Sequence, residues 1–153
     1  MNARFAACFR ALGVAPPRGV VEDLLGRYRE PHRAYHTLEH LEECFAAIDL
    51  LRNECERPAE VELGLWFHDA IYDPQRGDNE ALSAEWAERA LHEAGAPRDA
   101  CARVSELVLA TKHDAAPEGA DARLLVDIDL GILGSEPARF DAYERQVRAE
   151  YGF

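Results

Sequence analysis

His68 and Asp69 place two side chains that commonly bind metals next to each other, directly after the apolar run 65–67. An imidazole nitrogen and a carboxylate oxygen together suit divalent ions of intermediate hardness. Burying both groups in an apolar helix costs a large desolvation free energy unless a cation or a hydrogen-bond partner compensates. The pair therefore predicts a metal site if other segments supply further ligands.

Two other segments carry side chains of the same kind. His36 and His40 are four residues apart, so on a helix they lie on one face, one turn above the other. One of them can then bind the metal while the other reaches a substrate. Asp127 and Asp129 are two apart in a later apolar run, so only one of them is expected to face the same site. The combination of the three segments is a more specific signal of a metal site than any one of them alone.

The apolar residues recur at helical spacing along almost the whole chain. We expect helices over about 5–12, 20–28, 31–53, 58–71, 79–94, 97–113 and 124–134, and a last one capped by Ser135. No β-hairpin signal, internal repeat or inter-domain linker competes with this pattern. The sequence predicts a compact all-α bundle of about seven to eight helices.

Length and composition predict one domain. A chain of 153 residues with 48% hydrophobic content fits a single domain over 1–153, and the segments above predict a metal-site core over about 31–134. The four cysteines form no C-x-x-C pair, which is typical of reduced thiols in a cytosolic protein. There is neither an N-terminal apolar signal region nor a run of 18 apolar residues, so we expect a cytoplasmic protein without membrane contact.

The formal net charge of −12 argues against a nucleic-acid polymer as partner, because such binding depends on clustered Lys and Arg. A small phosphorylated ligand is still compatible with this charge, since a bound dication dominates the local field. Apolar faces on the terminal helices are compatible with a homodimer.

The H…HD…D arrangement resembles the HD superfamily of metal-dependent phosphohydrolases, an all-α family, over most of the chain. The resemblance implies four metal ligands, namely His40, His68, Asp69 and Asp129. The segment 35–40 also resembles the Y-H-N-x-x-H segment of cyclic-nucleotide phosphodiesterases of that superfamily, which implies that His36 gives a proton to the leaving oxygen. Asp129 is preferred to Asp127 because Leu or Arg commonly follows the last aspartate in this family.

A closer resemblance is to an uncharacterised bacterial subgroup of predicted HD phosphohydrolases. Its patterns R-x-Y-H-T-x-x-H, W-F-H-D-A-x-Y-D, D-N-E-x-x-S-A, A-T-K-H and D-x-D-L-x-I-L-G all occur between Arg33 and Gly134. Related sequences usually continue with more helical sequence after 147–151, whereas this chain stops at Phe153. That departure implies either a truncated chain or a naturally short member, and in both cases a partly open pocket.

Two imidazoles and two carboxylates leave coordination positions for water on a divalent ion, which we expect to be Mn, Fe, Co, Ni, Zn or Mg. The resemblance then implies hydrolysis of a small phosphoester, with a nucleotide as the favoured class, by a metal-bound hydroxide and without a covalent intermediate. His36 and Asp69 are the expected catalytic residues. One ion is expected, with room for a second.

Further candidates surround these ligands. His113 is a candidate ligand of a second metal or a phosphate contact. Lys112, the only lysine, suits either phosphate or the C-terminal end of a helix, and Arg33 suits either phosphate or an exposed helix start. Asn79, Glu80 and Ser83 follow the H-D segment closely and are candidates for lining the pocket or capping a helix.

Two alternatives keep the metal but change the function. A di-iron oxygenase, as found among some HD relatives, requires additional histidine ligands, for which only His113 and His32 are candidates. A non-catalytic metal or nucleotide sensor is compatible with the short C-terminus and with the lack of an obvious substrate-specificity motif.

Overall fold

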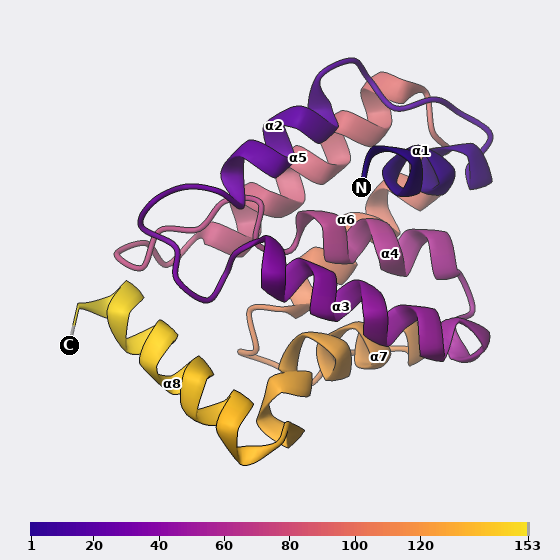
Figure 1. Ribbon diagram of the computed structural model, residues 1–153. Helices are drawn as coiled ribbons and strands as arrows, with labels where there is room; N and C mark the ends of the chain where they lie inside the picture. Colours follow the sequence, from indigo (N-terminus) through magenta and orange to yellow (C-terminus); the bar gives the residue numbers. More distant parts are fainter. Residues whose placement is uncertain (153) are drawn as a thin grey trace.

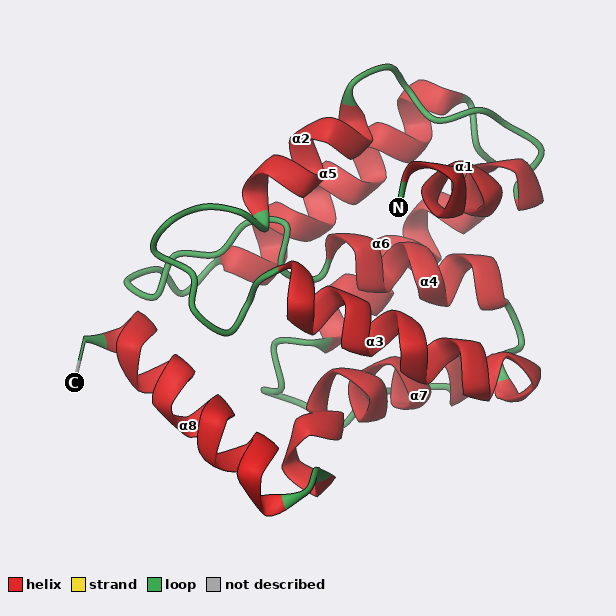
Figure 2. Ribbon diagram, in the orientation of Figure 1, coloured by secondary structure: helices red, strands yellow, loops and turns green. Residues whose placement is uncertain are grey.

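The computed structural model describes residues 1–152, and this part of the chain folds into helices joined by loops, without a strand (Figures 1 and 2). The prediction of an all-α bundle of seven to eight helices is confirmed. None of the described helices combines the length and the apolar character needed to cross a bilayer. The elements are α1 (Asn2–Ala11), α2 (Val20–Arg27), α3 (Leu38–Leu51), η1 (Arg52–Glu54), α4 (Pro58–Phe67), α5 (Asn79–Ala94), α6 (Arg98–Ala110), α7 (Ala120–Asp129), η2 (Leu130–Gly134) and α8 (Pro137–Tyr151).

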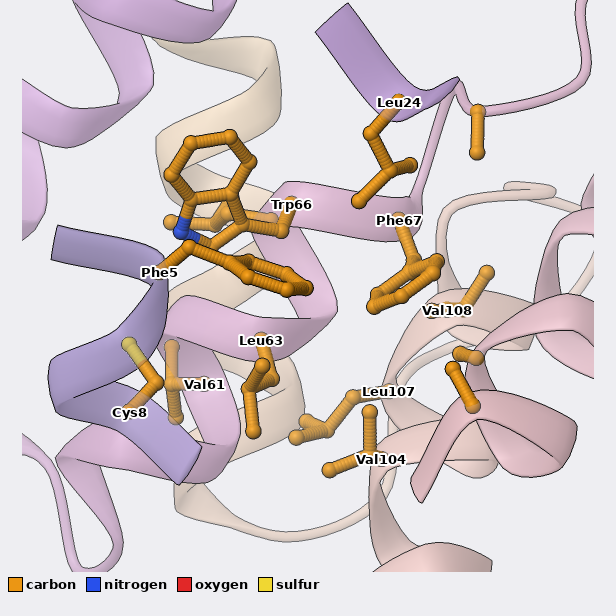
Figure 3. Packing of buried hydrophobic residues seen from close by; sticks show 14 of the residues in the cluster. Phe5, Cys8, Leu24, Val61, Leu63, Trp66, Phe67, Val104, Leu107 and Val108 are labelled. Carbon is orange, nitrogen blue, oxygen red and sulfur yellow. The ribbon is translucent and has the colours of Figure 1, made fainter. Parts of the chain in front are cut away.

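Helix α4 is the centre of the bundle. It begins with Pro58 at its first turn, where the missing N–H costs nothing, and every residue from Glu60 to Phe67 is buried. A helix that is largely apolar all round must be surrounded, and α4 contacts α1, α3, α5, α6 and α7. Figure 3 shows Trp66 beside Phe5 of α1, with ring centroids 5.1 Å apart. The C-terminal end of this helix leads directly into His68 and Asp69.

Two carboxylates on α4 are buried and paired. Glu60 accepts two hydrogen bonds of 2.7 Å from Arg103 of α6. Glu62 accepts one of 2.7 Å from Arg4 of α1 and another from Arg52 of η1. Because a buried charge is tolerated only when it is paired, these contacts fix how α4 sits against its neighbours.

Several expected helix boundaries differ from those of the structure, and three of the differences bear on the site. Helix α3 begins at Leu38 rather than near Pro31, because Thr37 occupies the N-cap position and its Oγ1 accepts from the Glu39 N–H. Helix α4 ends at Phe67 rather than about four residues later, and the expected helix over 124–134 divides into α7 and the 3-10 turn η2. His36 therefore lies in the loop before α3 and not one helical turn below His40.

Gly64 is where α4 approaches α6 and α7 most closely. A Cβ added at this position would lie 2.6 Å from Leu125 Cδ1 and 3.2 Å from Leu107 Cβ, both in the core. Both distances are shorter than ordinary van der Waals contact, so the buried Leu125 side chain or the neighbouring helices would have to shift.

We expect Gly64→Ala to lower the free energy of unfolding by about 1–3 kcal/mol through overpacking. The control is Gly26→Ala in α2, where an added Cβ meets nothing within 4 Å; it should change stability by less than about 1 kcal/mol, toward stabilisation. Denaturant unfolding of both variants measures the difference. Equal effects in the two variants would contradict the close packing at Gly64.

Candidate metal centre

Four side chains from three separate segments converge in the interior, and we call them the candidate centre: His40 of α3, His68 and Asp69 after α4, and Asp129 at the end of α7. His40 Nε2 lies 3.1 Å from His68 Nε2 and 3.2 Å from Asp129 Oδ1. Asp69 Oδ2 lies 3.0 Å from His68 Nε2. The structure thus brings together the four residues expected to bind metal, whereas Asp127 is exposed on the same helix as Asp129.

The donor atoms of this centre fit a divalent ion. His68 Nδ1 lies 2.7 Å from the Leu65 carbonyl oxygen, which can only accept, so Nδ1 carries a proton. In the neutral ring it is therefore Nε2 that has the lone pair for a metal. Asp69 Oδ2 is buried and has no hydrogen-bond partner within residues 1–152. Two imidazole nitrogens and two carboxylates, one of them with an unpartnered oxygen, match the donors that such ions take in proteins.

The charges of the candidate centre depend on one another. Burial alone would lower the pKa of His68, but the Asp69 and Asp129 carboxylates outweigh it and raise that pKa well above its usual value. Burial would raise the pKa of Asp129, yet hydrogen bonds with His113, His40 and His68 hold it well below the usual range. Both aspartates are therefore ionised side by side, an arrangement that a cation stabilises.

His36, the expected proton donor, lies beside this centre in the loop before α3. Its ring stacks on Tyr72 with centroids 4.1 Å apart, and its Nδ1 lies 2.7 Å from Glu150 Oε2. Burial lowers the pKa of His36, but the Asp69 and Glu150 carboxylates outweigh it and raise the pKa above the usual value. With Nδ1 donating to Glu150, Nε2 is the nitrogen free to face a substrate.

Glu150 is a residue of the site that sequence reasoning missed. It comes from α8, and its side chain is fully buried against the loop that carries His36. Its Oε1 accepts from the backbone N–H groups of Ala34, Tyr35 and His36, while Tyr72 Oη donates to Oε2 at 3.0 Å. A glutamate in a charged, surface-type helix gives no sequence signal of this contact, which spans 114 positions to His36.

Arg33 does not face a phosphate site, so both sequence interpretations of this residue are corrected. Its side chain is fully buried, and its five N–H groups donate to the carbonyl oxygens of His36, Asp69 and Ala70 and to Glu30. No donor is left for a ligand. Arg33 instead ties the loop that carries His36 to the backbone that carries Asp69.

His113 lies at the rim of the candidate centre, with Nε2 3.2 Å from Asp129 Oδ2 and its side chain 37% exposed. Its backbone has a φ of 57°, a left-handed conformation that is uncommon for a residue with a side chain. The hydrogen bond to Asp129 outweighs burial and raises the pKa of His113. Lys112 is exposed and forms an ion pair of 2.8 Å with Asp114, so it does not point into the centre.

The three candidates for lining the pocket have different roles. Asn79 bonds both the N–H and the carbonyl of Asp73, and Ser83 Oγ accepts from the Ile71 N–H, so these two shape the loop after Asp69. Glu80 is near enough to His113 for its charge to raise the pKa of that histidine. Of the three, Glu80 is the one whose charge acts at the rim of the centre.

Cys44 lies one turn after His40 and could be mistaken for a further ligand, since its sulfur is close to both histidines. Its Sγ is 3.8 Å from His40 Nε2 and 4.0 Å from His40 Nδ1. Nearly equal distances to both ring nitrogens place the sulfur against the imidazole rather than along the lone pair of Nε2. Burial, Asp129 and Asp69 also raise the pKa of this thiol well above its usual value, so we regard it as a packing residue.

One hollow borders the candidate centre, and a second lies behind the residues that contact His36 and is lined by none of the four residues of the centre. A small cavity of about 160 Å³ is lined by His40, Asp129, Tyr35 and Arg139, among others. A groove of about 690 Å³ runs past Tyr72 and Glu150, on the side of the candidate proton donor. Only the groove lies within the range of about 300–1,000 Å³ that is usual for ligand pockets.

Comparisons with known proteins add no relative. A scan against protein-family models gave no match, and searches of the curated proteins and of the solved structures gave none either.

We expect the protein to bind one divalent ion per chain, and we expect Asp129→Ala to weaken that binding by at least about 10-fold, because an inner-sphere carboxylate is lost. Asp127→Ala is the matched control, since Asp127 is an exposed aspartate of the same helix. Titration calorimetry with Mn²⁺ and Zn²⁺ measures both variants. Equal affinities in the two variants would remove Asp129 from the ligand set.

Proposed function

We propose that this protein is a metal-dependent phosphohydrolase of small phosphoesters, with nucleotides as the favoured substrate class. The observation that carries the proposal is the convergence of His40, His68, Asp69 and Asp129, beside a histidine whose Nδ1 is held by a carboxylate. The candidate metal ligands thus lie beside a candidate proton donor. Their order in the chain is that of the HD superfamily, which the sequence resembles.

A divalent ion held by the four residues of the candidate centre would supply Lewis-acid activation of a water molecule and of a phosphoryl oxygen. His36 supplies the proton for the departing oxygen. Glu150 accepts from Nδ1 of His36, so in the protonated ring Nε2 carries the proton that is transferred. Arg33 keeps His36 and Asp69 in register by binding the backbone carbonyls of both.

The surroundings of the candidate centre favour one ion over two. Of the described histidines outside the proposed ligands and His36, only His113 contacts a member of the centre. His32, the other spare imidazole, lies 2.8 Å from the Tyr72 carbonyl oxygen and has a 45% exposed side chain. A di-iron oxygenase would need more imidazole ligands than this arrangement offers.

The hollows at and near the site differ in the size of ligand that they can hold, and the larger one meets the site only at Tyr72 and Glu150, the partners of His36. The cavity of about 160 Å³ against His40 and Asp129 is too small for a nucleotide, but the groove of about 690 Å³ beside Tyr72 and Glu150 has room for one. Arg76 and Arg27 line the groove, and each is already paired with an acidic neighbour. Recognition of the organic part would therefore depend on stacking and hydrogen bonds more than on free positive charge.

Protein loaded with Mn²⁺, Co²⁺ or Ni²⁺ should release phosphate from members of a panel of nucleotides and sugar phosphates. His68→Ala should abolish that release, because the metal loses a buried ligand, and Asp127→Ala should leave it intact. Phosphate release is measured colorimetrically. Metal binding without turnover of any panel member would contradict the proposal and favour a metal or nucleotide sensor.

We expect His36→Ala to lower kcat by about 10²–10⁴-fold for alkyl phosphoesters, whose leaving oxygen needs a proton. For p-nitrophenyl esters the loss should be much smaller, since that leaving group departs as an anion. Steady-state kinetics on both classes measure the contrast, and His92→Ala, at an exposed histidine of α5, is the control. Equal losses for both classes would contradict the acid role of His36.

A further inference from the structure

Helix α8 is attached to the rest of the protein differently from the other helices. It contributes no residue to the buried core, and Figure 1 shows it along one edge of the molecule with its C-terminal end toward the loop before α3. Ser135 and Glu136, which join it to η2, are both extended, with ψ of 165° and 145°. A helix that buries so little apolar surface opens at a lower free energy than a core helix.

Polar and aromatic contacts hold α8 against the borders of the candidate centre. Arg139, in its first turn, donates to both oxygens of Glu43 at 2.7 and 2.8 Å. Midway along, Tyr143 packs edge-on against Tyr35 with centroids 4.6 Å apart. Near the other end Glu150 reaches the loop that carries His36.

The contact at Glu150 is the most concentrated of the three. Its carboxylate takes the N–H groups of residues 34–36 at 2.7, 2.7 and 3.0 Å, as well as His36 Nδ1 and Tyr72 Oη. Because α3 begins only at Leu38, these three N–H groups have no helical partner, and Glu150 is the partner that the described structure gives them. Their order therefore depends on α8 being docked.

We propose that α8 is a strap that opens and closes as a unit, and that its docking through Glu150 positions His36 beside the candidate centre. Closing gives the loop 34–36 its hydrogen-bond partner and holds the His36 ring between Glu150 and Tyr72. Opening frees that loop and widens the groove, which Glu150 and Tyr72 both line. The importance of His36 as an acid rests on the proposed function, but the motion of the strap does not.

Native-state hydrogen exchange of the metal-free protein, followed by NMR, tests the strap. The amides of residues 34–36 should exchange together with those of α8 and far faster than the amides of α4. Arg139→Ala should speed exchange at residues 34–36 by about two- to fivefold, the change expected for losing one surface ion pair. Arg148→Ala is the control, because within residues 1–152 the side chain of this arginine of α8 pairs only with Glu144 of the same helix.

Arg139 contacts none of the amides at 34–36, but its guanidinium lies 5.7 Å from the centroid of the Tyr35 ring. Faster exchange at residues 34–36 together with the amides of α8 therefore indicates opening of α8 as a unit, whereas faster exchange at residue 35 alone is a local effect of losing that ring contact and would count against the strap. An unchanged exchange rate at those amides in Arg139→Ala, or exchange only by the global unfolding that opens α4, would overturn the strap. The positioning role has its own readout in the ¹⁵N shift of His36 Nδ1. Glu150→Ala should move that shift and Glu150→Gln should restore part of it, whereas no change in Glu150→Ala would overturn the positioning role.

These measurements need neither substrate nor turnover. If the strap is observed and the protein hydrolyses no phosphoester, the strap stands and the proposed function fails. If hydrolysis is observed and the amides at 34–36 exchange only with global unfolding, the proposed function stands and the strap fails.

Discussion

The arrangement of the protein depends on burying α4 on every side. A helix with apolar residues all round has no face for solvent, so α1, α3, α5, α6 and α7 must pack around it. The buried carboxylates Glu60 and Glu62 fix its position through their arginine partners, and Gly64 lets two helices approach closely. The chain that leaves α4 therefore emerges inside the molecule, where His68 and Asp69 meet residues from α3 and α7.

A second constraint lies in the irregular segment 31–37, which carries the candidate proton donor but has no helical hydrogen bonds of its own. Arg33 donates both to the His36 carbonyl in this segment and to the Asp69 carbonyl after α4. Glu150 of α8 accepts from N–H groups of the same segment. The side chains of Arg33 and Glu150 are charged and buried, so leaving either without its hydrogen bonds would cost a large free energy. The position of His36 is thus set by two long-range polar contacts, while the position of His40 is set by helix packing.

Much of the fold and of the ligand set was predictable from local pattern. Apolar spacing identified the helices, and the H…HD…D order singled out the four residues that converge, among them Asp129 rather than the exposed Asp127. Apolar spacing failed where long-range polar contacts determine the backbone conformation. It predicted a helix over residues 31–37, but Glu150 accepts from the N–H groups of residues 34–36 and Arg33 donates to the His36 carbonyl. Glu150 gave no signal because its role comes from a contact 114 positions away.

The central claim is that His40, His68, Asp69 and Asp129 hold one divalent ion. Anomalous diffraction from crystals grown with Mn²⁺ or Zn²⁺ tests it most directly, because the signal locates the ion and identifies it. We expect one peak among the four residues, about 2.0–2.2 Å from His40 Nε2 and His68 Nε2. The claim would be contradicted if the anomalous peak lay elsewhere in the molecule. It would also be contradicted if His40 and His68 stayed in mutual contact with no ion between them in crystals grown with the metal.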